Sequence, residues 1–595
     1  MFSDDDKKCH IIDRSGRKVL PIGRDGFAMA LDSNVLVDKT MLIADILDSG
    51  YAVTLFCRPR RFGKTLNMTM MRAFLEIPTL TERPGDRPSF EGTVIWDAAG
   101  GKYRVEFQHY PVVHISFNTV KKDTWQAAWG EIRGLIAREY DRHSYLADSK
   151  SITPVERAYV NRIIGKSADD ADFASSLIML TSMLYRHHGI RPVVLIDEYD
   201  APVMAAYSSA DKGYHRSVIT FLKGWLTGAL KDGGEALAFA CLTGVQRISK
   251  ESIFSDLNNL VVNTPLSREF DRYFGFTSDE VAALAGYLGC EECLPEAKAW
   301  YDGYRFGSEE VYNPWSVLNY LRQGCTPGTY WSNTSSNAVV ADLLKHADDE
   351  TFSQVCRLLG PDGVVAAPLD LGVVFPDVGI RADAIWSMLY LAGYLTTDLT
   401  AMPDDYTLVR PLRIPNQEVA RLYRSEIISR FGNLAGGVDK LVRFRRALVD
   451  GDESAVTEEL SRIAMRSASV FDLVSENSCH MLLLGICFGI PGYGDPRSNR
   501  EGGLGRFDIQ IEPVALEAGA ADSYGAQVKR PRITIEVKFS NGAQDADLEQ
   551  LAHGGLLQIR DKGYDEEPLG AAASGRLRWG IAFAGKRLLA RCERV

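Results

Sequence analysis

Short apolar runs alternate with amphipathic segments from about residue 35 to residue 250. Residues 41–49, "MLIADILDS", carry apolar side chains at helical spacing and end before Gly50. The next run, "YAVTLFC" (51–57), is almost wholly apolar, which is typical of a strand covered on both faces. Further strands are expected at 111–117, 192–196 and 236–242, with helices between them. This alternation predicts a parallel α/β sheet.

The pattern changes after about residue 270. Residues 279–345 are expected to be mainly helical, and 387–419 to form a helix followed by a short two-stranded, winged-helix-like module. From 471 the alternation resumes, with a helix, the strands "RFDIQIE", "RITIEVKF" and "WGIAFAG", and a Gly/Ala-rich loop at 516–526. The predicted organisation has four parts: an α/β domain over residues 1–270, a helical and winged-helix-like region over 271–416, a helical linker over 417–470 and a second α/β domain over 471–595.

Composition narrows the class of protein. The 595 residues are too many for one hydrophobic core, and the 46% hydrophobic and 24% charged residues are ordinary for a globular protein. The net charge of −11 argues against a surface covered in positive charge, but it leaves room for a local basic groove. The first ten residues lack the apolar core of a signal peptide, and no apolar run reaches 18 residues. We therefore expect a cytoplasmic protein with no membrane segment.

The cysteines do not suggest a disulfide framework, since only ten are spread over the whole chain. Cys290 and Cys293 in "CEEC" have the spacing of metal ligands. No second Cys/His pair at suitable spacing follows them, so two ordinary thiols near a helix end are preferred over a zinc site.

A phosphate-binding signature follows the strand at 51–57. In "RPRRFGKTLNM" (58–68), Gly63, Lys64 and Thr65 fill the last three positions of the phosphate-loop pattern. Such a loop binds phosphate through backbone N–H groups at a helix N-terminus, a lysine, and a hydroxyl that contacts Mg²⁺. The glycine expected five residues before Gly63 is Arg58, so the match is incomplete. A helix start with an exposed lysine is the alternative.

Two acidic residues end a later apolar run, "VVLIDEYD". Asp197 and Glu198 therefore lie at the carboxyl end of a strand, where open α/β sheets bind their ligands. Asp197 is suited to hold Mg²⁺, and Glu198 to orient or deprotonate the attacking water. Helix capping or a salt bridge is the alternative. The following strand ends in "LTGVQR", which offers Thr243 or Gln246 as a sensor of the γ-phosphate, and Arg247 as a cation or a surface ion pair.

The order of these motifs resembles the bacterial AAA-ATPase-like family. The resemblance is carried by "LVDKT", "RPRRFGKTLNM", "LIDEYDAPV", "LTGVQRISKESIFSDLNNL", "YDGYRFG", "VYNPWSV" and "IPNQEV", and it extends from about residue 20 to 590. In that family Arg-Pro-Arg-Arg-Phe precedes Gly-Lys-Thr as a rule, so Arg58 follows the family's own variant. The resemblance implies an ATP site with Mg²⁺ on Thr65 and Asp197 and with the phosphates on the loop Arg61, Phe62, Gly63, Lys64, Thr65 and Leu66.

Proteins of that family commonly carry a C-terminal nuclease-like domain of the PD-(D/E)xK type, and this chain has matching residues. Glu536 and Lys538 share one face of the strand "ITIEVKF", and Asp508 comes from a preceding strand. The two carboxylates can bind Mg²⁺ or Mn²⁺, and Lys538 can stabilise the phosphate in the transition state. A cross-strand acid–base pair at a sheet edge is the alternative.

Neighbouring residues extend this second candidate site. Glu476 lies on the preceding helix, where this nuclease fold places an accessory acid, and Gln558 stands where the family carries its glutamine. His480, four residues from Glu476, is more readily explained as a packed helix residue. A positive groove for the nucleic acid is expected from Arg506, Lys529, Arg530, Arg532 and Lys562.

Two classes of function remain open at this point. The preferred one is an ATPase coupled to a metal-dependent nuclease, with DNA favoured over RNA as the partner and a homo-oligomer as a possible assembly. The other is an ATP-driven switch or assembly factor whose nuclease-like domain binds nucleic acid or protein without cleaving. Intact Asp508, Glu536 and Lys538 favour cutting, whereas the acidic net charge favours the switch.

Overall fold

The structure is a computed structural model that groups the chain into two compact units. Unit 1 comprises Met1–Ser335 and Ala366–Glu418, and unit 2 comprises Ser336–Val365 and Val419–Val595. We consider each unit by itself. The described residues are 9–78, 88–207, 209–211, 213–232, 234–246, 254, 257–331, 340, 349–360, 363–371, 384–397, 409–467, 475–502, 505–514, 529–542 and 544–595.

Unit 1 is built on a five-stranded sheet in which every neighbouring pair is parallel, as the alternation predicts. The strand order is β4-β5-β6-β3-β7, so β6 lies between the strand before the Gly-Lys-Thr and the strand before the two acids. The carboxyl ends of these three strands therefore meet at one edge. The bounds are β3 (Val53–Cys57), β4 (Val112–Ser116), β5 (Val193–Asp197), β6 (Phe239–Gly244) and β7 (Leu260–Asn263).

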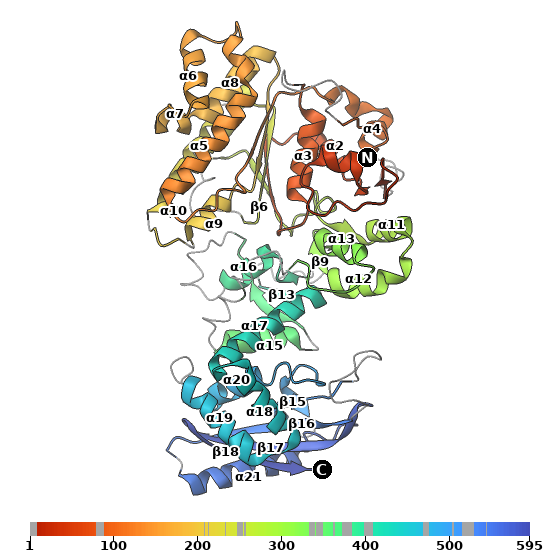
Figure 1. Ribbon diagram of the computed structural model, residues 1–595, viewed down its shortest axis with the longest axis vertical. Helices are drawn as coiled ribbons and strands as arrows, with labels where there is room; N and C mark the ends of the chain where they lie inside the picture. The colour runs from red at the N-terminus through yellow and green to blue at the C-terminus, as the bar shows by residue number, and fades with distance from the viewer. Residues whose placement is uncertain are drawn as a thin grey trace. The chain divides into compact units, whose positions relative to one another are not determined.

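Helices cover both faces of this sheet (Figure 1). Alternate residues of β3, such as Leu55, point into a large core shared with α5, α8 and α10, while Phe56 points to the opposite face and packs on Phe270 and Phe274. This explains why each strand is apolar throughout. The helices are α2 (Met41–Ser49), α3 (Lys64–Leu75), α4 (Val94–Asp97), α5 (Trp125–Arg142), α6 (Pro154–Ile164), α7 (Asp170–Ala174), α8 (Ser176–His188), α9 (Ala201–Tyr207) and α10 (Tyr214–Thr227).

Two smaller sheets and further helices complete unit 1. The first sheet has the order β8-β10-β9 and the second β11-β13-β12; β1 and β2 form a separate pair. The β12–β13 pair occupies the place of the predicted wing, and residues 398–408 between them lie outside the described part. The bounds are β1 (Ile11–Ile12), α1 (Phe27–Ser33), β2 (Leu36–Val37), β8 (Phe276–Thr277), α11 (Ser278–Leu288), α12 (Leu294–Tyr301), β9 (Tyr304–Phe306), β10 (Glu309–Tyr312), α13 (Pro314–Arg322), β11 (Val365–Pro368), α16 (Ala384–Ala392), β12 (Thr396–Thr397) and β13 (Val409–Arg413).

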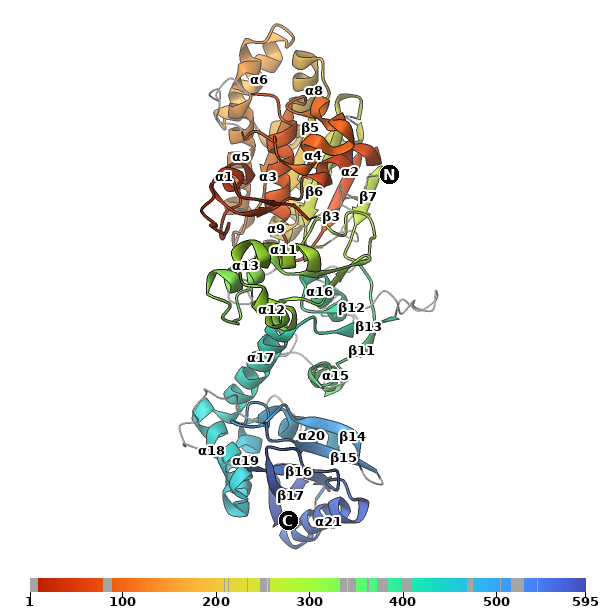
Figure 2. The ribbon, with the colours of Figure 1, turned by 90° about the vertical axis from the view of Figure 1, so that its right-hand side faces the viewer.

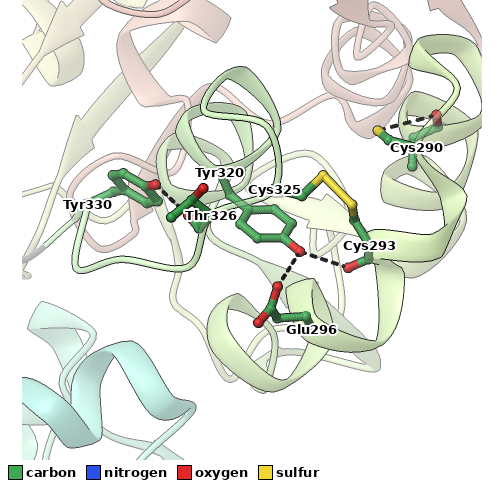
Figure 3. The surroundings of a disulfide bond; sticks show 8 residues. Cys290, Cys293, Glu296, Tyr320, Cys325, Thr326 and Tyr330 are labelled. Atoms are coloured by element: carbon green, nitrogen blue, oxygen red, sulfur yellow. Dashed lines mark hydrogen bonds between the residues drawn. A yellow bond between two sulfur atoms is a disulfide. The ribbon is translucent and has the colours of Figure 1, made fainter. Parts of the chain in front are cut away.

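A disulfide that the sequence did not predict joins Cys293, just before α12, to Cys325, just after α13 (Figure 3). Their Cα atoms are 6.1 Å apart, within the usual range for a disulfide. The Sγ of Cys290 instead faces the carbonyl of Ala285 at 3.7 Å. The pair in "CEEC" is therefore not a pair of free thiols, and no cluster of three or more His, Cys, Asp or Glu side chains suited to a metal ion occurs among the described residues.

Unit 2 contains a mixed five-stranded sheet with the order β14-β15-β16-β17-β18. The β14–β15 and β15–β16 pairs are antiparallel, the β16–β17 pair is parallel, and the β17–β18 pair is antiparallel. Because β16 and β17 are parallel, their connection must cross over the sheet, and α21 supplies it. The bounds are β14 (Arg497–Gly502), β15 (Gly505–Ile511), β16 (Arg530–Phe539), α21 (Asp545–Lys562), β17 (Ala573–Ala584) and β18 (Arg587–Arg594).

Glycines let α21 approach this sheet closely. A Cβ on Gly580 of β17 would lie 1.9 Å from the carbonyl oxygen of Ala552, and one on Gly555 would lie 3.4 Å from the carbonyl oxygen of Glu536. Figure 2 shows α18 and α19 on the other side of the sheet. The helices are α15 (Asp349–Leu359), α17 (Gln417–Ala435), which begins at the end of unit 1, α18 (Val438–Asp450), α19 (Glu453–Ser467) and α20 (Glu476–Ile486). None of the helices described in either unit is long and apolar enough to span a membrane.

Candidate nucleotide and metal sites

The loop between β3 and α3 has the backbone of a phosphate-binding turn. Arg61 and Gly63 have positive φ angles of 68° and 81°, and α3 starts immediately at Lys64. The glycine at 63 fits this conformation because it has no Cβ, whereas Arg61 is held in it against its preference. The first backbone N–H groups of α3 therefore point out of the helix end, where anions bind.

Arg58 explains why this loop needs no glycine at its start. Its φ is not among the positive ones, and its backbone N–H donates to the carbonyl of Gly244 at the end of β6. The guanidinium is fully buried, donates to the backbone oxygen and Oδ1 of Asn263 on β7, and lies over the rings of Phe274 and Phe306. Burial lowers the pKa of Arg58 to about 10, so the group stays charged near neutrality. Arg58 thus attaches the loop to β7, the edge strand next to β3.

Lys64 is buried within the loop. Its Nζ donates to the carbonyls of Arg58 at 3.0 Å and Pro59 at 2.8 Å, which leaves a third N–H for a ligand. Burial lowers the pKa of Lys64, while the carboxylates of Glu198, Asp200 and Asp197 act against that shift. The two carbonyls therefore hold the ammonium of Lys64 in position at the N-terminus of α3.

Thr65 and Asp197 meet directly. The Thr65 hydroxyl donates to Oδ2 of Asp197 at 2.8 Å, and the Thr243 hydroxyl donates to Oδ1 of the same carboxylate. Burial raises the pKa of Asp197, and the two hydroxyl donors oppose this. A hydroxyl and a carboxylate oxygen are ligands that Mg²⁺ accepts. The structure therefore brings Lys64, Thr65, Asp197 and Thr243 together at the carboxyl ends of three neighbouring strands.

Glu198 lies beside this group with an unusual backbone. Its φ of 50° is rare for a residue other than glycine. The carboxylate lines the same cavity as Lys64 and Thr65, and its Oε2 lies 3.5 Å from Nζ of Lys121. Strain of this kind is common where a catalytic side chain has to be aimed.

The sequence did not single out Asp200, the last acid of "DEYD". It is fully buried and accepts the backbone N–H groups of Val245 and Gln246 at 2.7 and 3.1 Å. The Tyr199 hydroxyl donates to the carbonyl of Gln246 at 2.6 Å. Together they fix the backbone after β6 at the position of the predicted sensor. Arg247 lies outside the described residues.

A cavity of about 290 Å³ opens over the loop, near the lower end of the size range of small-molecule sites. Basic side chains and the loop form one part of its wall, and apolar side chains form the rest. Trp315 stacks against the guanidinium of Arg61 at 4.3 Å and belongs to the motif "YNPWSV", whose role the sequence did not reveal. The wall includes Arg24, Val35, Leu36, Lys39, Arg60, Arg61, Phe62, Gly63, Lys64, Thr65, Leu66, Lys121, Glu198, Phe276, Leu284, Pro314, Trp315 and Leu318.

Polar bonds hold the helix that carries Trp315. Asn313 caps α13 by accepting the N–H of Ser316 at 3.1 Å, and the hydroxyl of Ser316 donates to Glu418 at 2.7 Å. Trp331 donates its backbone N–H to Glu418 and its indole N–H to the carbonyl of Arg60. The motifs "YNPWSV" and "IPNQEV" therefore support the cavity wall.

The second candidate site lies on β15 and β16 of unit 2. Oδ2 of Asp508 accepts the backbone N–H of Val537 at 2.7 Å, and Lys538 Nζ lies 3.0 Å from Oε1 of Glu536. Oε2 of Glu536 is buried and has no hydrogen-bond partner among the described residues. Burial, followed by the nearby charge of Asp508, raises the pKa of Glu536 to about 7. Asp508, Glu536 and Lys538 are thus gathered in one place.

A divalent cation fits the oxygen atoms of this site. An unpartnered buried carboxylate oxygen is costly, and a cation would satisfy it while offsetting the charge of Asp508 beside it. Two carboxylates are few ligands, but Mg²⁺ usually keeps several waters and needs only one or two carboxylates.

The supporting residues take different positions. Glu476 is exposed at the start of α20, whereas His480 is buried and its Nε2 lies 3.0 Å from both the carbonyl of Asp508 and the hydroxyl of Ser498. Gln558 on α21 donates to the Tyr564 hydroxyl at 3.1 Å. His480 is therefore a packed residue that supports the β15 backbone.

One member of the expected basic groove is not available to a ligand. Arg532 is buried, donates to the carbonyls of Asp565 and Glu567, and pairs with Glu512 at 2.6 Å, because its strand position faces the loop after α21. The expectation for Arg532 is therefore wrong. Lys529 and Lys562 are exposed and Arg530 is half-buried, while the side chain of Arg506 and residues 515–528 lie outside the described part.

Three comparisons relate this chain to known proteins. Residues 21–254 match the sequence model of the AAA-ATPase-like family, described as "Predicted AAA-ATPase". The chain is 29% identical over 418 residues to a protein from Azotobacter chroococcum mcd 1 described as "Uncharacterized protein in vnfD 5′ region", with 70% of this chain and 71% of that protein covered. A Walker-type ATPase of Pyrococcus abyssi is similar at a TM-score of 0.35 and 14% identity, over 69% of this chain and 99% of that one. The family match supports an AAA-ATPase-like domain and an ATPase-like function.

Proposed function

We propose that this protein binds and hydrolyses ATP in the cavity over the β3–α3 loop, and that unit 2 cleaves nucleic acid, preferably DNA, with the help of a divalent cation. For the nucleotide, the supporting observation is that Lys64, Thr65 and Glu198 share one cavity, with Asp197 bonded to Thr65 behind them. Thr65 at the start of α3 and Asp197 at the end of β5 are 132 positions apart in the chain, so a role in helix capping alone would not bring them together.

The residues have distinct tasks in ATP hydrolysis. Lys64 and the backbone N–H groups at the start of α3 bind the phosphates, and the apolar wall with Trp315 receives the base. Thr65 and Asp197 would hold Mg²⁺, which when bound offsets charge on the β- and γ-phosphates. Glu198 orients the attacking water and accepts its proton. Thr243 and the backbone fixed by Asp200 link this site to the end of β6.

For unit 2, the supporting observation is the buried, unpartnered oxygen of Glu536 next to Asp508 and Lys538. A bound divalent cation would lower the pKa of a water and offset charge on the scissile phosphate. Asp508 and Glu536 would hold it, and Lys538 would donate to the developing charge on the phosphate. The order of helix, three antiparallel strands, crossover helix and parallel strand is also consistent with the PD-(D/E)xK type of domain that the sequence resembles.

A nuclease assay on the full chain tests this proposal. Single- and double-stranded DNA and RNA are incubated with Mg²⁺ or Mn²⁺, with and without ATP. Asp508→Asn and Lys538→Met are expected to lose cutting while keeping ATP hydrolysis, since they lie in the other unit. Asp561→Asn is the matched control, because Asp561 is an exposed carboxylate on α21. Equal cutting by wild type and all three variants would refute the role of the site.

The second candidate function is an ATP-driven switch in which unit 2 binds without cutting. The burial of Arg532 favours it, because this removes one cation from the expected nucleic-acid groove. In the same assay, ATP hydrolysis with nucleic-acid binding but no cleavage in any metal would support the switch.

A further inference from the structure

Lys121 lies on a short turn between β4 and α5 whose backbone is fixed at the nucleotide site. The N–H of Phe117 donates to the carbonyl of Asp197 at 2.9 Å, which joins the end of β4 to the end of β5. The N–H of Val120 donates to the carbonyl of Phe117, and both side chains are fully buried in the core of the sheet. The backbone just before Lys121 is therefore anchored at the end of β5, where the carboxylates lie.

That side chain bridges two acceptors. Nζ lies 2.7 Å from Oδ1 of Asn118 and 3.5 Å from Oε2 of Glu198, and the side chain is 51% exposed. It lines the same cavity as Lys64 and Thr65. An exposed ion pair of this kind contributes little to stability, so its ammonium is easily redirected.

Three of the five other cations that line the cavity have contacts of their own. Arg61 stacks on Trp315, and Lys39 donates to Glu280 and to the carbonyl of Arg272. Lys64 donates to the carbonyls of the loop itself. Among the described residues, the ion pair that reaches Glu198 comes from Lys121.

We propose that Lys121 is a catalytic cation for the γ-phosphate, and that it exchanges Glu198 for that phosphate when ATP binds. This rests on the proposed ATPase function. Glu198 is the group that orients the attacking water, so it must lie next to the γ-phosphate. A cation in contact with Glu198 is therefore separated from the γ-phosphate by about one water molecule. A triphosphate carries more charge than a single carboxylate and attracts the ammonium more strongly. The exchange frees Glu198 to bind the water.

The chemical step balances without any further reactant. The water oxygen forms a bond to the γ-phosphorus, and the bond from that phosphorus to the β–γ bridging oxygen breaks. One water proton passes to Glu198 and then to solvent, and ADP and inorganic phosphate are released. Lys121 keeps its proton throughout and donates hydrogen bonds to the γ-phosphate oxygens as their charge changes.

The test uses the full chain with Lys121→Met, Lys121→Arg and Lys122→Met. Lys122 is the matched control, since it is the adjacent lysine but does not line the cavity. Binding of ADP and of a slowly hydrolysed ATP analogue is measured by calorimetry, and kcat by phosphate release. Lys121→Met is expected to bind ADP within twofold of wild type, to bind the analogue about tenfold more weakly, and to lose about 10²-fold or more in kcat. Lys121→Arg should recover part of kcat, because it restores the charge.

The outcomes distinguish failure of the Lys121 assignment from failure of the ATPase proposal. If wild type binds no nucleotide, the ATPase proposal fails. If wild type hydrolyses ATP but Lys121→Met has normal kcat, weakens both ligands equally, or turns over faster, the assignment of Lys121 is overturned while the ATPase proposal stands. A faster variant would mean that Lys121 restrains Glu198 and does not assist the reaction.

Discussion

Replacing Glu536 by Gln should stabilise unit 2 at pH 8. The carboxyl group has an ordinary pKa of 4.5, and burial raises it to about 7 in the folded protein. An acid with a raised pKa holds its proton more firmly when folded, so ionisation opposes folding. This destabilisation is absent below about pH 4.5, grows as the pH rises, and is complete above about pH 7. A difference of about 2.5 units corresponds to ~3 kcal/mol at pH 8.

The variant removes this term because glutamine does not titrate. Wild type and Glu536→Gln should have similar free energies of unfolding at pH 5 and differ by up to ~3 kcal/mol at pH 8 in favour of the variant. Lys538 loses its partner, but its side chain is 22% exposed and can be solvated. A residue kept at a cost in stability is expected where function needs it.

Unfolding of unit 2 within the full chain can be followed through Trp579, which is its only tryptophan and is fully buried. Fluorotryptophan labelling gives this side chain its own NMR signal, assigned with Trp579→Phe. Urea midpoints are then measured from pH 5 to pH 8, with Asp561→Asn as the control.

Parallel pH profiles for wild type and Glu536→Gln would refute the reasoning. Added Mg²⁺ provides a second readout, because a cation on the ionised carboxylates should raise the midpoint of wild type at pH 8 but not that of the variant.

Three further predictions concern both units. Lys64→Ala should weaken ATP binding, measured by calorimetry, by about 10- to 100-fold through loss of a charge-assisted hydrogen bond. Glu198→Gln should keep ATP binding but lose about 10²- to 10⁴-fold in kcat, measured by phosphate release. Equal kcat in Glu198→Gln and wild type would contradict this prediction. Cys325→Ser should lower the free energy of unfolding of unit 1 by about 3–4 kcal/mol without reductant, because it opens a disulfide loop with a sequence separation of 32. With reductant the variant and wild type should be equally stable, and urea midpoints measured in both buffers test this. Gly580→Ala should destabilise unit 2 by about 1–3 kcal/mol, because its Cβ would overlap a carbonyl oxygen of α21. The control Gly554→Ala should be tolerated, because its Cβ would meet no atom within 4 Å. Similar thermal midpoints for the two variants would argue against the close contact at Gly580.

The local pattern was enough to predict the parallel sheet of unit 1. Strands buried on both faces are apolar throughout, and helices between them require right-handed crossovers, so the alternation leaves few arrangements. The same rule placed the residues after β3, β5 and β6 at one edge, because parallel strands end on the same side. For Glu536 and Lys538, the two-residue period of a strand was sufficient to predict a shared face.

Other features depend on contacts between distant parts of the chain. Arg58 was read as a missing glycine, yet its side chain binds Asn263, which is 205 positions away. Asp200 was not singled out within its motif, and Lys121 belongs to no motif. Asp200 matters because the end of β6 lies next to it, and Lys121 because Glu198 does. Neither charge nor spacing along the sequence reports such neighbours.

The burial of charged groups was also decided by the tertiary structure. Arginine is usually exposed at the surface, but the position of Arg532 on β16 directs its side chain toward the carbonyls of the loop after α21. Cys293 and Cys325 form a disulfide because α12 and α13 pack side by side, and a spacing rule for metal ligands could not show this. A sequence specifies which side chains can bind a ligand, but only packing specifies which partners lie within reach of them and how much water surrounds them. The neighbouring groups and the remaining water determine the pKa of Glu536 and the availability of Lys121.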